Sequence, residues 1–153
     1  MFSQFNYSGI ILQNLTKAQK QRIQLFQNTC VRFIMNLRKF DHISGAFKTL
    51  NFINMENLRN IQSLTLMHKI LNNKAPHYLC EKIVYQGDHH SHLTRNRANI
   101  RCSTSKTNFG LNRFFNCTGR MYNELSTSLN FPKTISVNTL KFRLKNYYFN
   151  NLN

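Results

Sequence analysis

Apolar residues recur at every third or fourth position along most of the chain, which is the period of amphipathic helices. Between residues 16 and 39 the apolar side chains fall within one stripe roughly 100° wide on a helical wheel, and basic side chains gather on the opposite side. The stripe consists of Ile23, Phe26, Cys30, Phe33, Ile34 and Leu37. Thr16 with Gln19 fits a capping box at the start of this first helix. We expect the stripe to face the core, and the basic side to face either solvent or phosphates.

A second helical pattern begins after Asn54, which suits an N-cap, and Glu56 is well placed for the helix dipole. Its apolar surface is broad, so we expect this helix to be buried on most sides and central to the fold. Asn72–Asn73 fits its C-terminal end. A short helical turn is expected over 44–50, capped by its first serine, and a short helix over 76–84, opened by its proline. The residues that share one side of the central helix are Leu58, Ile61, Leu64, Thr65, His68 and Leu71, and those that widen its apolar surface are Leu66, Met67 and Ile70.

The helical period is lost over residues 86–110, which are polar and irregular. A loop this long in a small domain is usually functional or disordered, and part of 99–105 is suited to pairing as a short strand. The spacing of three and four residues returns over 111–125 and predicts a fourth helix, in which Gly119 costs about 1 kcal/mol relative to Ala. Ser136 is expected to cap the last helix.

These elements predict an all-α fold of about five helices, in a small irregular bundle with one long basic loop. Residues 1–14 are expected to form a loosely ordered N-terminus, and residues 15–150 a single helical domain. The net charge is +16, from 21 Lys and Arg against 5 Asp and Glu, and it is unevenly distributed along the chain. Residues 41–88 are nearly neutral, whereas the segments on either side are basic. A near-neutral centre between two basic flanks is typical of a packed core with charged surfaces on either side.

A charge of +16 indicates a polyanionic partner, with nucleic acid the first expectation and an anionic membrane surface the second. The plainer alternative is a basic protein with no specific anion, because charge alone is not a specific signal. No apolar run approaches the ~18 residues needed to cross a bilayer. We therefore expect RNA or DNA as the partner and no membrane.

Basic residues in three groups are the candidate phosphate contacts. Arginine forks match phosphate oxygens, and Phe109 beside the loop is suited to stacking on an exposed base. The groups are Lys17, Lys20, Arg32, Arg38 and Lys39 on the first helix, Arg95, Arg97, Arg101 and Lys106 in the loop, and Lys141, Arg143 and Lys145 on the last helix.

The scarcity of acidic residues excludes most carboxylate chemistry. A two-metal polymerase or nuclease site needs several carboxylates brought together. We therefore predict no catalytic residue and do not expect this chain to be an enzyme. The carboxylates, of which no two are closer than seven residues, are Asp41, Glu56, Glu81, Asp88 and Glu124.

Three histidines and three cysteines invite a zinc interpretation, but their spacing does not support it. Structural zinc sites supply ligands as close pairs, whereas these thiols stand 22 and 15 residues apart, so we expect surface histidines, no metal and no cofactor. The chain has no C-x-x-C pair and its start lacks a signal segment. The thiols are interpreted as reduced and the protein as intracellular, nuclear or cytoplasmic and not secreted. The residues concerned are His89, His90, His92, Cys80, Cys102 and Cys117.

Six ordered segments of the sequence give a more specific signal. They are Leu25–Leu37 (LFQNTCVRFIMNL), Leu50–Ile53 (LNFI), Leu64–Leu79 (LTLMHKILNNKAPHYL), Leu93–Arg101 (LTRNRANIR), Phe109–Leu125 (FGLNRFFNCTGRMYNEL) and Ile135–Tyr147 (ISVNTLKFRLKNY). In this order they resemble the C-terminal region downstream of the polymerase domain in jockey-like non-LTR retrotransposon reverse transcriptases of arthropods. The resemblance spans roughly residues 12–149, nearly the whole chain.

The resemblance implies a retroelement-derived tail that acts on nucleic acid, with the upstream reverse-transcriptase domain as a further partner. The family tends to have Trp where this chain has Phe52 and Tyr122, and its catalytic Asp pair is absent, since Asp41 and Asp88 stand apart. DNA synthesis therefore does not carry over. We expect non-specific binding to the RNA or DNA backbone. The alternatives are a translated remnant with no independent function, or one piece of an active RNA-directed DNA polymerase encoded upstream.

Overall fold

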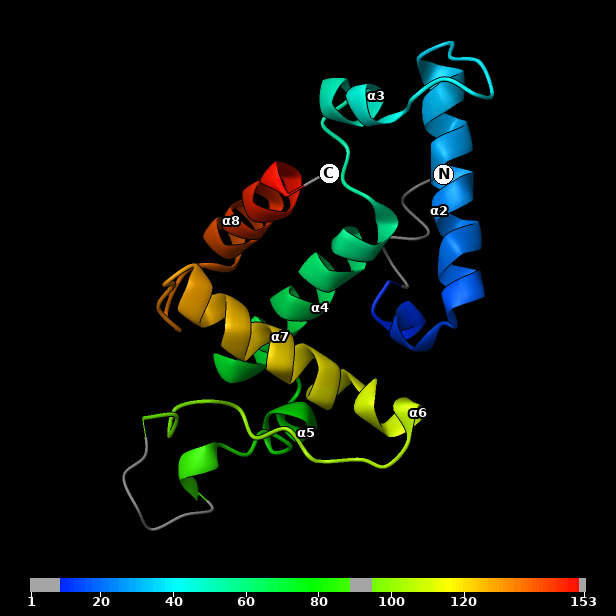
Figure 1. The fold of residues 1–153 in the computed structure, drawn as a ribbon. Coiled ribbons are helices and arrows are strands. Elements are labelled where there is room, and N and C mark those ends of the chain that lie inside the picture. The colour runs from blue at the N-terminus through cyan, green and yellow to red at the C-terminus, as the bar shows by residue number, and fades with distance from the viewer. Residues whose placement is uncertain (1–8, 89–94, 152–153) are drawn as a thin grey trace.

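The computed structural model of the 153-residue chain describes residues 9–88 and 95–151. These residues form seven α-helices and two short 3₁₀ helices (Figure 1), which confirms the all-α class. Tyr85 and Ile100 form an isolated antiparallel bridge. The elements in chain order are η1 (Ile11–Asn14), α2 (Lys17–Ile34), α3 (Ser44–Thr49), α4 (Met55–Leu71), α5 (His77–Cys80), η2 (Gln86–Asp88), α6 (Asn108–Leu111), α7 (Phe114–Ser128) and α8 (Val137–Asn150).

Short helices account for the difference from the predicted count of about five. Helix α3 has six residues, and α5 and α6 have four each. The predicted helix over 76–84 ends at Cys80, and the one predicted from residue 111 begins at Phe114, after a separate turn, α6, that the sequence pattern did not predict. Ile100, one partner of the bridge, lies within 99–105, where a short strand is expected, whereas Tyr85 lies outside that range.

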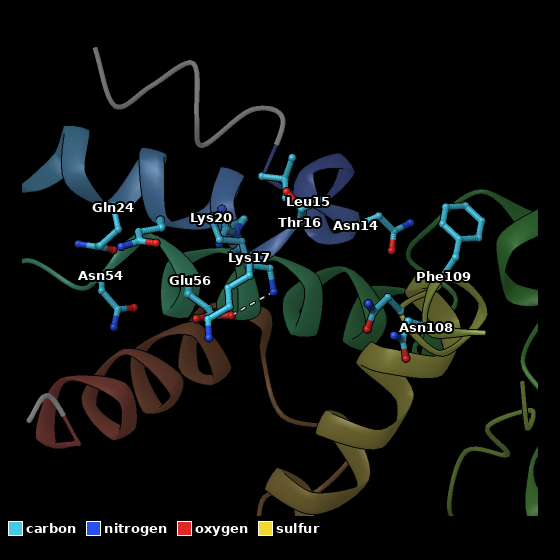
Figure 2. Close-up of a pocket in the computed structure, with 13 residues that line it drawn as sticks. Asn14, Leu15, Thr16, Lys17, Lys20, Gln24, Asn54, Glu56, Asn108 and Phe109 are labelled. Carbon is cyan, nitrogen blue, oxygen red and sulfur yellow. Dashed lines mark hydrogen bonds and ion pairs between the residues drawn. The ribbon is translucent and has the colours of Figure 1, made fainter. Parts of the chain in front are cut away.

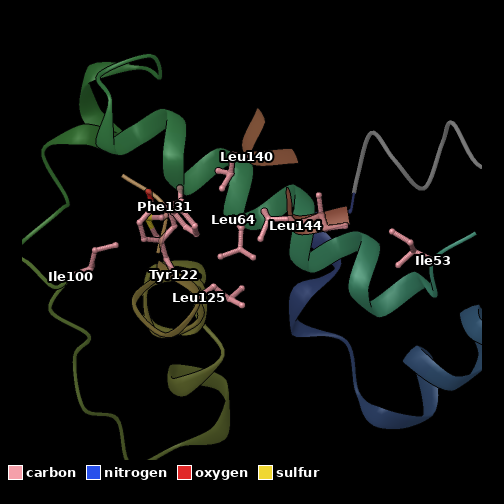
Figure 3. Close-up of a cluster of buried hydrophobic side chains, with 10 residues drawn as sticks. Ile53, Leu64, Ile100, Tyr122, Leu125, Phe131, Leu140 and Leu144 are labelled. Carbon is pink, nitrogen blue, oxygen red and sulfur yellow. The ribbon is translucent and has the colours of Figure 1, made fainter. Parts of the chain in front are cut away.

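Helix α4 forms the centre of the fold, as its broad apolar surface predicts. Nine of its 17 residues are buried, and it packs against α2, α5, α7 and α8. The main core lies where α4, α7 and α8 meet (Figure 3), with Leu64, Tyr122 and Leu144 among its most buried side chains. A smaller cluster around Val31 and Phe47 joins α2 to α3.

Helix α2 ends at Ile34, well before the predicted end at Lys39. Asn36 follows in a left-handed conformation with a φ of 52°. An asparagine in this conformation just after a helix closes the last turn and redirects the chain. The candidate phosphate contacts Arg38 and Lys39 therefore lie beyond the helix and not on its basic face.

The face of α2 that packs inward is not the predicted apolar stripe. Its buried residues are Gln27 and Val31, whereas Phe33 is 88% exposed and Ile34 is also exposed. The side-chain amide of Gln27 donates to the carbonyl of Ile53 over 2.8 Å, which ties this face to the segment before α4. At about 100° per residue, the buried face is turned by roughly a quarter of a turn from the centre of the stripe. The prediction of an inward stripe is therefore wrong.

Side-chain amides of α7 hold the segment that follows the long loop. Asn123 accepts from the N–H of Ile100 over 3.0 Å and donates to the carbonyl of the same residue over 2.9 Å, as a neighbouring strand would. Seven residues earlier on α7, Asn116 accepts from the N–H of Ser103 over 3.0 Å. Part of the predicted loop is thus fixed against α7.

Candidate nucleic-acid interface

A cleft of about 970 Å³ opens between the start of α2, the first turns of α4 and the short helix α6 (Figure 2). Two helix N-termini lie at this cleft, because Thr16 caps α2 in the predicted capping box and Asn54 caps α4. The N-terminal end of a helix carries partial positive charge and favours an anion. The cleft is lined by Asn14, Leu15, Thr16, Lys17, Lys20, Gln21, Gln24, Asn54, Glu56, Arg59, Asn108, Phe109 and Asn112.

Three cationic side chains share the cleft with one carboxylate. They are Lys17, Lys20 and Arg59. The Nζ atom of Lys20 lies 3.2 Å from Oε1 of Glu56, an ion pair that Figure 2 marks with a dashed line. One carboxylate cannot neutralise three cations, so the cleft keeps a positive charge. Because exposed pairs of this kind contribute little, Lys20 is able to turn to another anion at small cost.

Arg59 is the buried cation of the cleft, with 4% of its surface exposed. Its Nη1 atom has no hydrogen-bond partner in the part of the chain that the structure describes. Burial lowers the pKa of Arg59 from its ordinary value, and the carboxylate of Glu56 opposes that shift. A guanidinium that is held away from water and has one nitrogen without an acceptor favours a nearby anion. Sequence reasoning missed Arg59, although a lone arginine inside a helix expected to be buried is itself a signal.

The aromatic ring of Phe109 stands on α6, across the cleft from the lysines (Figure 2), and is 65% exposed. The hydroxyl of Thr107 caps this short helix. Asn108 and Asn112 line the same side and carry amides that both donate and accept hydrogen bonds. An exposed ring suits the stacking of a base, and amides suit the polar edges of bases.

Within the first group of candidate residues, the structure brings Lys17 and Lys20 together in the cleft. Arg32 is half-buried near the other end of α2, about 18 Å from Lys20 along the helix axis at ~1.5 Å per residue. Arg38 and Lys39 are exposed beyond that end. The predicted continuous basic face is therefore divided into two separate sites.

The loop group lies in the segment that runs under α7 to α6 (Figure 1), and none of its members lines the cleft. Its members Arg95, Arg97, Arg101 and Lys106 are all exposed. Lys133, which sequence reasoning missed, steadies this segment: its Nζ atom donates to the carbonyl of Ala98 over 2.8 Å and lies 4.6 Å from the ring centre of Tyr85. Burial lowers the pKa of Lys133.

The group on the last helix splits between two faces of α8. Lys141 and Lys145 are exposed one turn apart and border a groove of about 360 Å³ that Ile53 and Ile61 also line. Arg143 is exposed and does not line that groove. The candidate cations are therefore spread over several surfaces of the molecule.

The zinc interpretation concerns His89, His90 and His92, which lie outside the described residues. Within residues 9–88 and 95–151, no group of three or more His, Cys, Asp or Glu is placed to hold a metal ion, and the four cysteines are free thiols. Burial raises the pKa of the Cys102 thiol, which disfavours the reactive thiolate. None of the described helices combines the length and the apolar character that a membrane span requires.

Comparisons of the chain with protein-family models, with curated proteins and with solved structures gave no match. The charge and the geometry of the chain itself therefore bear on its function. Its cations are exposed on several surfaces, and one cleft holds the buried cation Arg59.

Proposed function

We propose that the chain binds the phosphate backbone of RNA or DNA without sequence specificity and has no polymerase activity of its own. The observation that carries this proposal is the exposure of the twelve candidate cations and the scarcity of carboxylate partners for them among the described residues. Ten of them are exposed, and within the described residues Lys20 is the one with a carboxylate at ion-pair distance. Cations without carboxylate partners attract a polyanion, and the release of its counterions drives binding.

Backbone binding does not require the cations to converge on one site. Phosphates repeat along a strand, so basic residues on separate surfaces each reach one of them. Such contacts position a protein on nucleic acid but carry no sequence information. A net charge of +16 also raises the rate of encounter with any polyanion.

We further propose a retroelement origin for the chain, as the C-terminal tail of a jockey-like non-LTR retrotransposon reverse transcriptase. The six ordered sequence segments support this origin. Because the chain has no adjacent aspartates, its role in that setting is to hold nucleic acid and not to synthesise DNA. The upstream reverse-transcriptase domain is then a further partner, and the setting is the nucleus or cytoplasm.

One observation favours a second candidate function, that of one piece of an active RNA-directed DNA polymerase encoded upstream. The rings of Phe33 and Phe40 are 88% and 89% exposed near the C-terminal end of α2. Large exposed apolar side chains in one region suit an interface. An upstream reading frame with a paired-aspartate motif would support this candidate. If the chain is instead a translated remnant with no independent function, it should unfold without a cooperative transition and bind an apolar dye through exposed apolar surface.

The salt dependence of binding tests the proposal. If six to ten phosphates are contacted, affinity for a hairpin RNA or a DNA duplex falls by about 10³–10⁵ between about 50 and 200 mM salt. Replacing Arg95, Arg97 and Arg101 together by Gln lowers the slope of log affinity against log salt by about 2 to 3. The matched control replaces the same three arginines by Lys. Because this keeps the positive charge, the slope of log affinity against log salt should stay unchanged. A flat salt dependence contradicts the proposal.

A further inference from the structure

The cleft between α2, α4 and α6 is a more specialised site than backbone binding by exposed cations requires. Arg59 lines it with 4% of its surface exposed, and its Nη1 atom has no hydrogen-bond partner among the described residues. A buried arginine is ordinarily matched by a carboxylate or by several acceptors. The one carboxylate of the cleft, Glu56, pairs with Lys20 at 3.2 Å and is shared between the two cations.

Two helix N-termini add to the positive field of the cleft. Thr16 and Asn54, which cap α2 and α4, both line it, and these helices have 18 and 17 residues. Helices of this length carry partial positive charge at their first turns. Together with Lys17 and the buried Arg59, they surround a position where a phosphate group would be stabilised from several directions.

We propose that this cleft binds a phosphate of single-stranded nucleic acid, with Lys17, Lys20 and Arg59 around the phosphate and a neighbouring base on the ring of Phe109. The inference rests on the proposed function and adds to it the site and the form of nucleic acid. The cleft volume of about 970 Å³ is that of a pocket able to enclose a nucleotide.

The burial of Arg59 argues for a single strand over a duplex. A phosphate has to move into the cleft to approach a side chain that is 4% exposed, whereas a duplex presents its phosphates on a broad convex surface. Bases stacked within a duplex are unavailable to the ring of Phe109, while unpaired bases stack on exposed aromatic side chains. Exposed cations elsewhere, such as Arg95, contact either form.

Glu56 competes with the incoming phosphate for Lys20. When the phosphate binds, Lys20 exchanges a carboxylate oxygen for a phosphate oxygen, and the exposure of the pair keeps the cost of that exchange small. Replacing Glu56 by Gln removes the competing charge. The Glu56→Gln variant should therefore bind a single strand more tightly, an effect that a purely structural role of Glu56 would not produce.

Equilibrium binding of the full chain to a single-stranded RNA of about ten nucleotides, compared with a duplex of equal length, tests the inference. Arg59→Met and Phe109→Ala should each lose about tenfold in single-strand affinity, with duplex affinity within about twofold of the unsubstituted chain. Glu56→Gln should gain about threefold for the single strand. The matched control, Arg22→Gln, removes an exposed charge of α2 outside the cleft and should change both affinities by the same factor.

Thermal melting of each variant verifies that it folds. If Arg59→Met does not fold, the variants Phe109→Ala and Lys17→Gln, which change exposed residues, decide the outcome. Equal losses of affinity for the single strand and the duplex, or no loss of single-strand affinity, overturn the inference. The proposed function still holds in that case if binding to the duplex depends on salt. Failure of the unsubstituted chain to bind either form overturns both. Displacement of the strand by an equimolar mononucleotide also overturns the inference, because a free nucleotide is then the ligand.

Discussion

The Nδ1 atom of His68 on α4 lies 2.9 Å from the hydroxyl oxygen of Tyr122 on α7. The other ring nitrogen, Nε2, lies 2.8 Å from the carbonyl of Ile135, which only accepts, so Nε2 carries the proton. In the neutral imidazole Nδ1 then accepts the proton of the Tyr122 hydroxyl. Tyr122 also packs edge-on against Phe131 at 5.6 Å between ring centres (Figure 3). This buried pair therefore joins α4, α7 and the segment before α8.

Replacing Tyr122 by Phe should destabilise the fold. The change keeps the ring and its packing but leaves Nδ1 of His68 buried without a donor, which costs about 1–3 kcal/mol. Urea unfolding followed by circular dichroism measures the loss. Tyr78→Phe, at an exposed tyrosine of α5, is the matched control and should stay within about 0.5 kcal/mol of the unsubstituted chain. Equal midpoints for the two variants would contradict the assigned hydrogen bond.

Stability should fall at alkaline pH because two tyrosines are held neutral by the fold. Burial raises the pKa of Tyr148 to about 12 and also raises that of Tyr122. Phenols of the unfolded chain titrate near 10, so the stability from these two groups is fully present below about pH 10 and is lost as pH rises through the folded-state values. The melting temperature should therefore decline above about pH 10. Tyr148→Phe should make that decline shallower, and an unchanged decline would contradict the assignment.

Replacing Asn123 by Ala should release the segment that α7 holds. The change removes both hydrogen bonds to the backbone of Ile100 and leaves its N–H and carbonyl without those partners, at a cost of about 2 kcal/mol. Hydrogen exchange of the amides over 99–103 should speed up more than exchange in α4. The control is Asn138→Ala, at an exposed asparagine of α8, which should leave this exchange pattern unchanged.

Replacing Gly119 by Val should destabilise the packing of α7 on the same segment. A Cβ at this position would lie 3.0 Å from Sγ of Cys102 and 3.4 Å from Cγ2 of Ile100. A branched side chain there has to displace both neighbours, at a cost of about 1–3 kcal/mol. Gly45→Ala in α3 is the control, since a Cβ at that position meets nothing within 4 Å, and it should gain up to about 1 kcal/mol. If the denaturant midpoints of Gly119→Val and Gly45→Ala shifted in the same direction, the predicted packing of Gly119 against its neighbours would be contradicted.

The starts of the three helices α2, α4 and α8 were predictable from the sequence because their signals are local. Thr16, Asn54 and Ser136 cap α2, α4 and α8 as predicted, each through a bond to a backbone N–H three residues later. Such bonds need no tertiary contact. Two other starts were predicted wrongly. Ile43, and not Ser44, occupies the N-cap of α3, where no side chain caps the helix. Helix α7 begins at Phe114 and not at residue 111.

Helix ends were harder to predict, because the apolar pattern can continue past them. Asn36, Asn51, Asn73 and Asn130 adopt positive φ just after α2, α3, α4 and α7. Glycine usually takes this position, and asparagine is the substitute that tolerates it. The pair Asn72–Asn73 was identified as a helix end, whereas the apolar residue after Asn36 extended the predicted first helix by several residues.

The sequence by itself determined that α2, α4, α7 and α8 are helical, that α4 is central and that the surface is basic, because capping, periodicity and charge are properties of neighbouring residues. Tertiary structure decided which face of α2 is buried. Apolar and amide side chains lie on adjacent sides of that helix. The hydrogen bonds of Gln24 and Gln27 to the backbone around Ile53 turn the amide side inward. Tertiary structure also placed Arg59 and Lys17 in the lining of one cleft. Groups so distant along the chain meet only when the helices pack, since no local interaction brings them together.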